Sequence, residues 1–452
     1  MTIKHYYDEA LAQGSYYIES KGKAALIDPW RDPKVFTDQA VNDRAKIIAV
    51  FETHPHADFI SSHAEVHDIT GADIYINEKA GAEYPHKPMN HNDEVKIGDL
   101  TVQALFTPGH SPDHNSYLLK DESGKAVAVF TGDSLFVGDV GRPDLREGAG
   151  HIKTDRRELA AQMFDTIRNI FDKLDDEVKV YPAHGAGSLC GKNMGDELSS
   201  TIGKEKASNW AFSLKDRKEF IETFLEGQAF IPQYFPNSVE VNRRGAPALK
   251  KAVEGIHKSL GTGVPENHTV VDTRGFAAFK KGHIPGALNI RCDADDKFET
   301  WLGALLAPDE KLCLVCRSRT DADAAVYRAA KIGYEGNISA AIIDPSGEKV
   351  VAPEFDLAHF RQNSADYTIV DVRNATETED NKIFEAAVHI PLHELRKRAH
   401  ELPSDKPIAV HCAGGYRSAA AFSILSARAD VQVYDIGDAV TGFAEKSAAA
   451  SA

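Results

Sequence analysis

The chain is short of cysteine and of long hydrophobic runs. Its 452 residues include only five cysteines: Cys190, Cys292, Cys313, Cys316 and Cys412. A small, odd and widely spread set of this kind is not a disulfide framework and is typical of a reducing compartment. No apolar stretch approaches the length of about 20 residues that spans a bilayer, and the first residues show no apolar secretion signal. We therefore expect a cytoplasmic protein with no membrane partner.

Positive charge is also in short supply. The 52 lysines and arginines face 68 aspartates and glutamates, which gives a formal net charge of −16. Such a field repels phosphate and argues against nucleic acid as a partner. Any site for an anionic substrate must therefore build its own positive patch. The hydrophobic fraction of 42% and the charged fraction of 27% are those of a globular protein, and the length predicts two to four domains.

Several apolar runs of the N-terminal half end in residues that can bind a metal. Strands are expected at 24–27, 47–51, 101–106, 126–130 and 178–181, and a helix at 156–174. The last four of these strands lead, in chain order, into His54 and His56, His110, Asp133, and His184. Because polar residues at the ends of neighbouring strands can converge in space, this pattern predicts a single site.

The second half of the chain repeats itself. The segments 270–274, 282–287 and 312–316 correspond to the segments 369–373, 387–392 and 408–412. A period of roughly a hundred residues indicates two α/β domains of the same fold. We therefore expect three domains, at 1–244, 245–351 and 352–452, with linkers around 237–247 and 350–354.

The sequence from Thr53 to Phe59, THPHADF, together with His110, Asp133 and His184 downstream, resembles the metallo-β-lactamase superfamily. Within that superfamily it looks like the persulfide dioxygenase branch, which is close to glyoxalase II. The resemblance implies an αββα sandwich that carries a metal at one edge. It also implies that the metal ligands are His54, His110 and Asp133. Two imidazoles and one carboxylate leave three adjacent positions open, which suits Fe(II) that binds a substrate beside O2.

Phe59 departs from the pattern of the dinuclear zinc hydrolases, which have a histidine at this position to hold a second metal. A phenyl ring cannot bind a metal, so the second position is left with only Asp58 and His184. We expect these two residues to hydrogen-bond the iron ligands, with His56 as a further outer partner. The prediction is one Fe(II) per chain.

Two other residues of this half are candidates for substrate contacts. Arg142 lies in a loop, 139–144, that resembles the arginine-bearing loop of the family. It either orients the loop or pairs with a carboxylate of the thiol carrier. Cys190 follows His184 in a glycine-containing segment. It is either an ordinary buried thiol or, as the resemblance to persulfide dioxygenase–rhodanese fusions implies, a residue at the pocket rim that takes up sulfane sulfur.

In the last domain the segment 412–418, CAGGYRS, follows an expected strand and precedes a helix that begins near Ala419. This segment resembles a rhodanese active-site loop, in which backbone N–H groups and a helix N-terminus stabilise a cysteine thiolate and its persulfide. Arg417 either fixes the loop or binds a sulfite or thiosulfate oxyanion. The residues implied for catalysis and substrate binding are Cys412, Gly414, Gly415, Tyr416 and Arg417, with Asp371 and Arg373 resembling the supporting pair of the family.

The middle domain keeps the cysteine, Cys316, but its loop reads CRSRTD and contains no glycine. Asp321 stands where the last copy has Arg417, and a carboxylate there repels an anionic sulfur donor. We therefore expect the middle copy to be inactive, and to space or dock its neighbours.

Together these features predict an enzyme of sulfide detoxification. It would oxidise a low-molecular-weight thiol persulfide with O2 to sulfite, and form or use thiosulfate through a persulfide on Cys412. One alternative is a glyoxalase II-like zinc thioester hydrolase with a rhodanese appendage, against which Phe59 argues. Another is a non-enzymatic sulfur relay or redox sensor that carries persulfide on Cys412 or Cys190. The sequence leaves open the carrier thiol (glutathione, coenzyme A or another) and the oligomeric state, with a homo-oligomer as one option.

Overall fold

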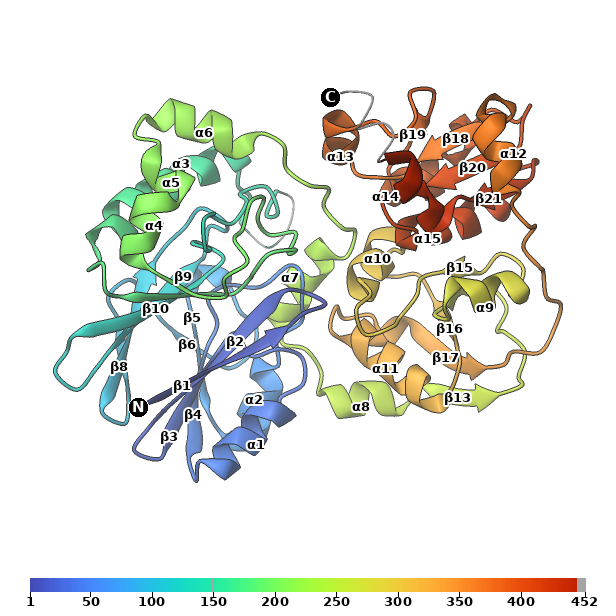
Figure 1. Ribbon diagram of the computed structural model, residues 1–452. Coiled ribbons are helices and arrows are strands. Elements are labelled where there is room, and N and C mark those ends of the chain that lie inside the picture. The colour runs from blue at the N-terminus through green and yellow to red at the C-terminus, as the bar shows by residue number, and fades with distance from the viewer. Residues whose placement is uncertain (148–149, 151, 445–452) are drawn as a thin grey trace. The chain divides into compact units, whose positions relative to one another are not determined.

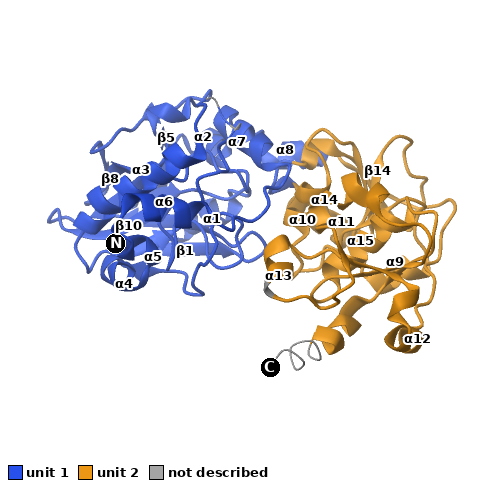
Figure 2. Cartoon of the chain, turned by 90° about the horizontal axis from the view of Figure 1, so that it is seen from above, with its two compact units in different colours: residues 1–254, 330–333 blue, residues 255–329, 334–452 orange. Residues whose placement is uncertain are grey.

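The computed structural model describes residues 1–147, 150 and 152–444. The chain forms two compact units, of which the first holds residues 1–254 and 330–333 and the second holds residues 255–329 and 334–452 (Figure 2). Within the described residues, no helix is both long enough and apolar enough to cross a membrane.

The first unit is built on two six-stranded sheets (Figure 1). In each sheet the strands lie side by side in the order of the chain. The first sheet contains β1 Thr2–Asp8, β2 Gln13–Ser20, β3 Lys23–Ile27, β4 Lys46–Phe51, β5 Asp73–Ile76 and β6 Lys87–Pro88. The second contains β7 Glu94–Ile97, β8 Leu100–Phe106, β9 Asn115–Lys120, β10 Ala126–Gly132, β11 Lys179–Pro182 and β12 Ser200–Thr201.

Helices cover the outer face of each sheet, which confirms the expected αββα sandwich. One core cluster lies between the sheets and includes Phe51, Tyr117 and Phe130. Two outer clusters join the sheets to their helices. The helices are α1 Lys34–Asn42 and α2 His63–Thr70 on the first sheet, and α3 Arg156–Asn169, α4 Ile202–Ser208, α5 Trp210–Ser213 and α6 Arg217–Leu225 on the second.

The strands expected from apolar runs are present as β3, β4, β8, β10 and β11. The helix expected at 156–174 is shorter, because α3 ends at Asn169 and a separate 3-10 turn follows at Phe171–Lys173. The N-terminus of α3 is fixed by Asp155, whose side chain accepts hydrogen bonds from the backbone N–H groups of Arg157 and Glu158.

The linker expected around 237–247 is not present as such, because most of this segment is helical. Helix α7, Phe235–Arg244, belongs to the first unit and buries Val239 and Asn242. The Asn242 amide donates hydrogen bonds to the carbonyl oxygens of His56 and Phe59. This helix therefore holds the metal-binding motif in place instead of connecting domains. A further short helix, α8 Leu249–Glu254, also falls in the first unit.

The second unit contains two parallel sheets that repeat one strand order. The first sheet has the order β13-β17-β16-β14-β15 and the second has the order β19-β18-β20-β21, so β15-β14-β16-β17 matches the second sheet. The strands are β13 His257–Leu260, β14 Thr269–Asp272, β15 Leu288–Asn289, β16 Leu312–Cys316, β17 Ile338–Ile343, β18 Thr368–Asp371, β19 Val388–His389, β20 Ile408–His411 and β21 Val433–Asp435. The repeat in the sequence is thus a repeat in the fold.

Helices connect the parallel strands of both copies. They are α9 Phe276–Lys281, α10 Phe298–Leu305 and α11 Arg319–Ala330 in the middle copy, and α12 Leu357–Gln362, α13 Ala375–Asp380, α14 Leu392–Arg398 and α15 Tyr416–Ser426 in the last. Helix α15 begins three residues before the start expected near Ala419, because Gly415 with a φ of 94° turns the chain directly into the helix.

Candidate functional site

His54, His110 and Asp133 lie together at one edge of the sandwich. His54 follows β4, His110 follows β8 and Asp133 follows β10, as the strand-end pattern predicts. One ligand atom from each lies within 4.8 Å of the other two, and all three side chains are buried. His110 Nε2 is 3.5 Å from Asp133 Oδ2. The structure therefore brings together the three residues expected to bind the metal.

Hydrogen bonds to the far side of each ring aim the free nitrogens into this cluster. The Thr53 hydroxyl donates its single proton to Asp28 Oδ2. Its oxygen, Oγ1, therefore accepts a hydrogen bond from Nδ1 of His54. Nδ1 of His110 donates to the carbonyl oxygen of Arg142 at 2.9 Å. Each ring thus keeps the lone pair on Nε2 for the cluster.

Three inner atoms of the cluster form no hydrogen bond within the described part of the chain. Nε2 of His54 and both carboxylate oxygens of Asp133 are buried without a hydrogen bond among the described residues. Burial lowers the pKa of His54 and of His110 well below the usual range of histidine, so both rings are neutral. Buried, unpaired donor atoms on two neutral imidazoles and a carboxylate are what a divalent metal ion requires.

His56 lies beside this cluster and faces a different carboxylate. Its Nε2 is 3.2 Å from Asp28 Oδ1. Burial alone lowers the pKa of His56, but Asp28, with help from Asp133 and Glu52, outweighs burial and raises it to about 9. His56 also offers a ligand atom within 4.8 Å of ligand atoms of Asp133 and His184, so its expected outer position stays a prediction. Sequence reasoning missed Asp28, although it also stands at the end of an expected strand.

His114 is a second residue that the sequence analysis missed. Its Nε2 accepts a hydrogen bond from the backbone N–H of Asp133 at 3.1 Å, and its Nδ1 shares one with Thr107 Oγ1. The ring therefore fixes the backbone that carries the ligand carboxylate. Its position four residues after His110 was the available signal.

Phe59 is buried with its ring centre 4.3 Å from that of His56. Behind it lies a second group of candidate ligands: Asp58, His184 and Cys190 also offer ligand atoms within 4.8 Å of one another. The analysis of the sequence left this second position with Asp58 and His184 alone, and the structure corrects that by adding the thiol. Nε2 of His184 lies 3.4 Å from oxygens of both Asp58 and Asp133.

Cys190 is therefore buried beside the metal cluster and does not sit at a pocket rim. Burial, together with the carboxylates of Asp58 and Asp133, raises its pKa well above the usual value of a thiol. Its backbone is held in place, because its N–H donates to Ser188 Oγ and its carbonyl accepts from the N–H of Arg142.

Arg142 is buried, and its guanidinium is occupied by protein groups. Its Nε and Nη2 each lie 2.7 Å from an oxygen of Asp144, and it also donates to the carbonyl oxygens of Leu189 and Ala229. Of the two roles considered for this residue, these contacts favour the one that orients the loop.

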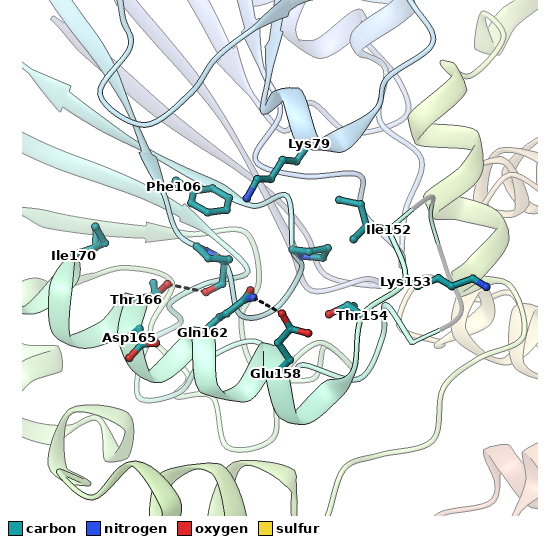
Figure 3. Close-up of a pocket in the computed structure, with 12 residues that line it drawn as sticks. Lys79, Phe106, Ile152, Lys153, Thr154, Glu158, Gln162, Asp165, Thr166 and Ile170 are labelled. Atoms are coloured by element: carbon teal, nitrogen blue, oxygen red, sulfur yellow. Dashed lines mark hydrogen bonds between the residues drawn. The ribbon is translucent and has the colours of Figure 1, made fainter.

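A cavity of about 620 Å³ lies next to the loop that carries His110 (Figure 3). Pro108 and Pro112 of that loop form one side, and residues of α3 form another. Thr166 on α3 donates a hydrogen bond to the carbonyl oxygen of Pro108. None of the three candidate metal ligands lines this cavity.

The loop of the last copy closes around Cys412. The side chain of Cys412 is buried, and its Sγ accepts a hydrogen bond from the N–H of Gly415 at 3.1 Å. The thiol lies at the N-terminus of α15. These contacts are the ones expected for a cysteine whose thiolate or persulfide is stabilised by the backbone.

Arg417 and the pair of Asp371 and Arg373 are tied within the protein. Both terminal nitrogens of Arg417 bind the Glu377 carboxylate, at 2.5 and 2.7 Å. Arg373 forms a buried ion pair with Asp371 and donates to backbone carbonyls of 377 and 381. Asp371 and Arg373 do not line the cavity next to Cys412, which favours the supporting role of this pair over direct substrate contact.

The cysteine of the middle copy, Cys316, is held by other contacts. Burial raises the pKa of Cys316 to about 12, and its Sγ accepts a hydrogen bond from Thr273 Oγ1. Asp321 binds Arg317 and Ser318. A neutral, buried thiol is a poor nucleophile, which agrees with the expectation that this copy is inactive.

Comparison with known proteins shows which families the two halves of the chain resemble. The metallo-beta-lactamase superfamily matches residues 10–184, and the rhodanese-like domain matches residues 256–341 and 356–443. The hydroxyacylglutathione hydrolase of Dictyostelium discoideum is 28% identical over 229 residues, which are 50% of this chain and 78% of that protein. The crystal structure of ETHE1 from Myxococcus xanthus is 29% identical with a TM-score of 0.46, and the match covers 54% of this chain and 98% of that one.

A structure solved as a metallo-beta-lactamase from Staphylococcus aureus subsp. aureus COL resembles a larger part of the molecule. It is 32% identical, with a TM-score of 0.68, over 76% of this chain and 99% of that one. The sandwich, the cluster at its edge and this match lead to one conclusion: the chain belongs to the metallo-beta-lactamase superfamily and carries two rhodanese-like domains after its sandwich.

Proposed function

We propose that the first unit is a mononuclear non-haem iron dioxygenase that oxidises low-molecular-weight thiol persulfides. The observation that carries this proposal is the donor set: two neutral imidazoles and one carboxylate, from His54, His110 and Asp133, whose ligand atoms lie together and are buried. When bound there, ferrous iron would supply adjacent open positions at which a persulfide and O2 meet. The overall reaction is RSSH + O2 + H2O → RSH + H2SO3.

The protein groups around the cluster hold the ligands and exclude water. Thr53 and the carbonyl of Arg142 fix the two rings, and the buried Phe59 ring fills space beside them. The neighbouring Asp28 carboxylate raises the pKa of His56 to about 9, which favours the protonated ring. Because His56 lies against this carboxylate, it can keep the charge of the site balanced when an anionic persulfide enters.

The last copy would act as the sulfurtransferase. In this reaction the Cys412 persulfide donates its outer sulfur to sulfite: Cys–S–S⁻ + SO3²⁻ → Cys–S⁻ + S2O3²⁻. The N–H of Gly415 that binds Sγ stabilises the thiolate that leaves. The same residues support the reverse reaction, in which thiosulfate loads the cysteine.

The test separates the two activities on one chain. Protein purified without oxygen should contain one iron per chain and should consume O2 with glutathione, coenzyme A or other persulfides. His110→Ala and Asp133→Ala should lose iron and O2 uptake together but keep thiosulfate sulfurtransferase activity. His257→Ala, which removes an exposed histidine of the second unit, is the matched control and should change neither activity.

One observation supports a second candidate function, a dinuclear zinc hydrolase. Asp58, His184 and Cys190 could hold a second ion beside the first, as a dinuclear zinc hydrolase of thioesters requires. Two zinc ions per chain, thioester hydrolysis and no O2 uptake would overturn the dioxygenase proposal in favour of this hydrolase.

A further inference from the structure

The cavity at Cys412 is built from both rhodanese-like copies. It has a volume of about 420 Å³. Its lining from the last copy is Cys412, Gly414, Tyr416 and Arg417, and its lining from the middle copy is Arg291, Asp295, Asp296, Lys297 and Trp301. The copy that lacks an active loop of its own therefore contributes half of the wall around the active cysteine of its neighbour.

Direct contacts join the two halves of this wall. The Tyr416 hydroxyl donates a hydrogen bond to the carbonyl oxygen of Arg291, and the Arg291 guanidinium lies over the Tyr416 ring, 5.0 Å from its centre. Tyr416 is the first residue of α15, four positions after the cysteine. A cation from the middle copy is thus fixed against the active loop by a cation–π contact.

The segment that carries Arg291 is held by a buried arginine. Arg328 on α11 pairs with Glu299 and donates hydrogen bonds to the carbonyl oxygens of Asp293 and Asp296. Glu299 is fully buried and Arg328 nearly so. These contacts give the segment a fixed path past the cavity, so the wall is a rigid surface on which a side chain can be positioned.

The two arginines that line the cavity differ in how the protein holds them. Glu377 occupies both terminal nitrogens of Arg417. Arg291 binds Asp296 through Nη2 alone, and its buried Nε has no hydrogen-bond partner among the described residues. A guanidinium has five N–H donors, so both side chains keep donors, but the two bonds to Glu377 fix the orientation of Arg417, whereas Arg291 is held by one bond to Asp296 and its side chain is 35% exposed.

We propose that the middle copy supplies the anion-binding side of the Cys412 cavity, with Arg291 as the residue that binds the sulfur oxyanion, sulfite or thiosulfate. A chain with a net charge of −16 needs such a local cation to attract an anion. Arg291 is then a substrate-binding residue, and Arg328 is the positioning residue behind it. The identity of the oxyanion rests on the transferase function proposed above, but the presence of an anion site does not.

The first test compares two reagents that modify Cys412 in the full-length protein. Iodoacetate is an anion and iodoacetamide is neutral, and both alkylate thiolates; mass spectrometry of the Cys412 peptide gives each rate. Arg291→Ala should lower the iodoacetate rate about tenfold, the loss of one charge-assisted hydrogen bond. The iodoacetamide rate should stay unchanged, which shows that the loop is intact.

The matched control is Arg319→Ala, which removes an exposed arginine of the same copy that does not line the cavity. It should alter neither rate. Arg291→Lys keeps a positive charge and should fall between the wild type and Arg291→Ala. If Arg291→Ala and Arg319→Ala give the same ratio of the two rates, the anion site proposed at Arg291 does not exist.

The second test uses the transferase reaction. Arg291→Ala should raise the KM for thiosulfate about tenfold and leave kcat within a factor of about two, because the contact forms in the substrate complex as well as in the transition state. An unchanged KM would overturn the assignment of the oxyanion to Arg291. If wild-type protein shows no transferase turnover, the proposed function fails, and the alkylation ratio still decides whether the anion site is present.

Discussion

Gly141 offers a way to weaken the metal site without changing any ligand. It precedes Arg142, whose carbonyl oxygen accepts the hydrogen bond from His110. A Cβ atom placed on Gly141 would lie 2.0 Å from the carbonyl oxygen of Asp133 and 3.0 Å from Nδ1 of His110. Real Cβ atoms essentially never come closer than 3.0 Å to a heavy atom outside their own residue and its two chain neighbours. In a Gly141→Ala variant, the loop and the Asp133 backbone must therefore move apart by about 1 Å.

We expect this shift to carry the Arg142 carbonyl, which follows Gly141 in the loop, away from His110 and to break the hydrogen bond that orients the ring. That bond is 2.9 Å long, and at about 3.9 Å it no longer counts as a hydrogen bond. Loss of the outer partner of a metal-bound histidine typically costs about 10- to 100-fold in metal affinity. We therefore expect Gly141→Ala to weaken metal binding by about 1.4–2.8 kcal/mol. Competition with a chelator, followed under nitrogen with Fe(II) and in air with Zn(II), measures this change.

The control is Gly195→Ala, in a neighbouring loop of the same unit. Its added Cβ would meet Val137 Cγ1 at 3.4 Å, an ordinary van der Waals contact. This variant should keep the wild-type affinity within a factor of about two. The transferase reaction of Cys412 should be normal in both variants. A Gly141→Ala protein that folds and binds metal as tightly as the wild type would refute the claim that the Arg142 carbonyl orients His110.

Three further predictions address other parts of the chain. Cys412→Ser should abolish thiosulfate sulfurtransferase activity and leave persulfide oxidation intact, so that sulfite accumulates; loss of the activity in Cys316→Ser instead would show that the wrong copy was assigned. Phe59→His should add a nitrogen ligand to the second group and raise the metal stoichiometry on zinc titration, with loss of O2 uptake; an unchanged single-metal stoichiometry would show that Phe59 is only a packing residue. Burial raises the pKa of Asp435 from 3.8 to about 6, so the folded state holds this proton more tightly than the unfolded state. As the pH rises from about 4 to 6, the protein loses the stability that this protonation provides, up to about 3 kcal/mol. Asp435→Asn should therefore melt at a higher temperature than the wild type at pH 7.5 but not at pH 4, and equal differences at both pH values would contradict this.

The parts of the site that follow one another along the chain could be predicted from the sequence. His54, His110 and Asp133 each stand after an apolar run, and these runs become β4 of the first sheet and β8 and β10 of the second, whose ends bring the three side chains together. The same rule would have found Asp28, which follows β3 and binds both Thr53 and His56. It was missed because a lone aspartate after a strand is also a common turn residue.

Contacts between distant segments could not be predicted. Cys190, in the loop after β11, lies beside Asp58, which stands in the loop after β4. The pairing of Arg417 with Glu377 joins residues 40 positions apart. Neither has a periodicity or a spacing that a single sequence reveals, since side chains find these partners only after the strands have assembled.

The two arginines of the family motifs illustrate what such a motif can and cannot identify. Arg142 and Arg417 were both candidates for binding an anionic group of the substrate, and both are held by carboxylates of the protein, Asp144 and Glu377. In a low-dielectric interior an unpaired guanidinium is costly, so a buried arginine is stable only with such a partner. An arginine that binds a transient anion must instead remain partly exposed and keep free donors, as Arg291 does with a side chain that is 35% exposed. Exposed positions of this kind carry no motif, which is why the anion-binding residue of the last copy had to be found in the structure, on a copy with no active loop of its own.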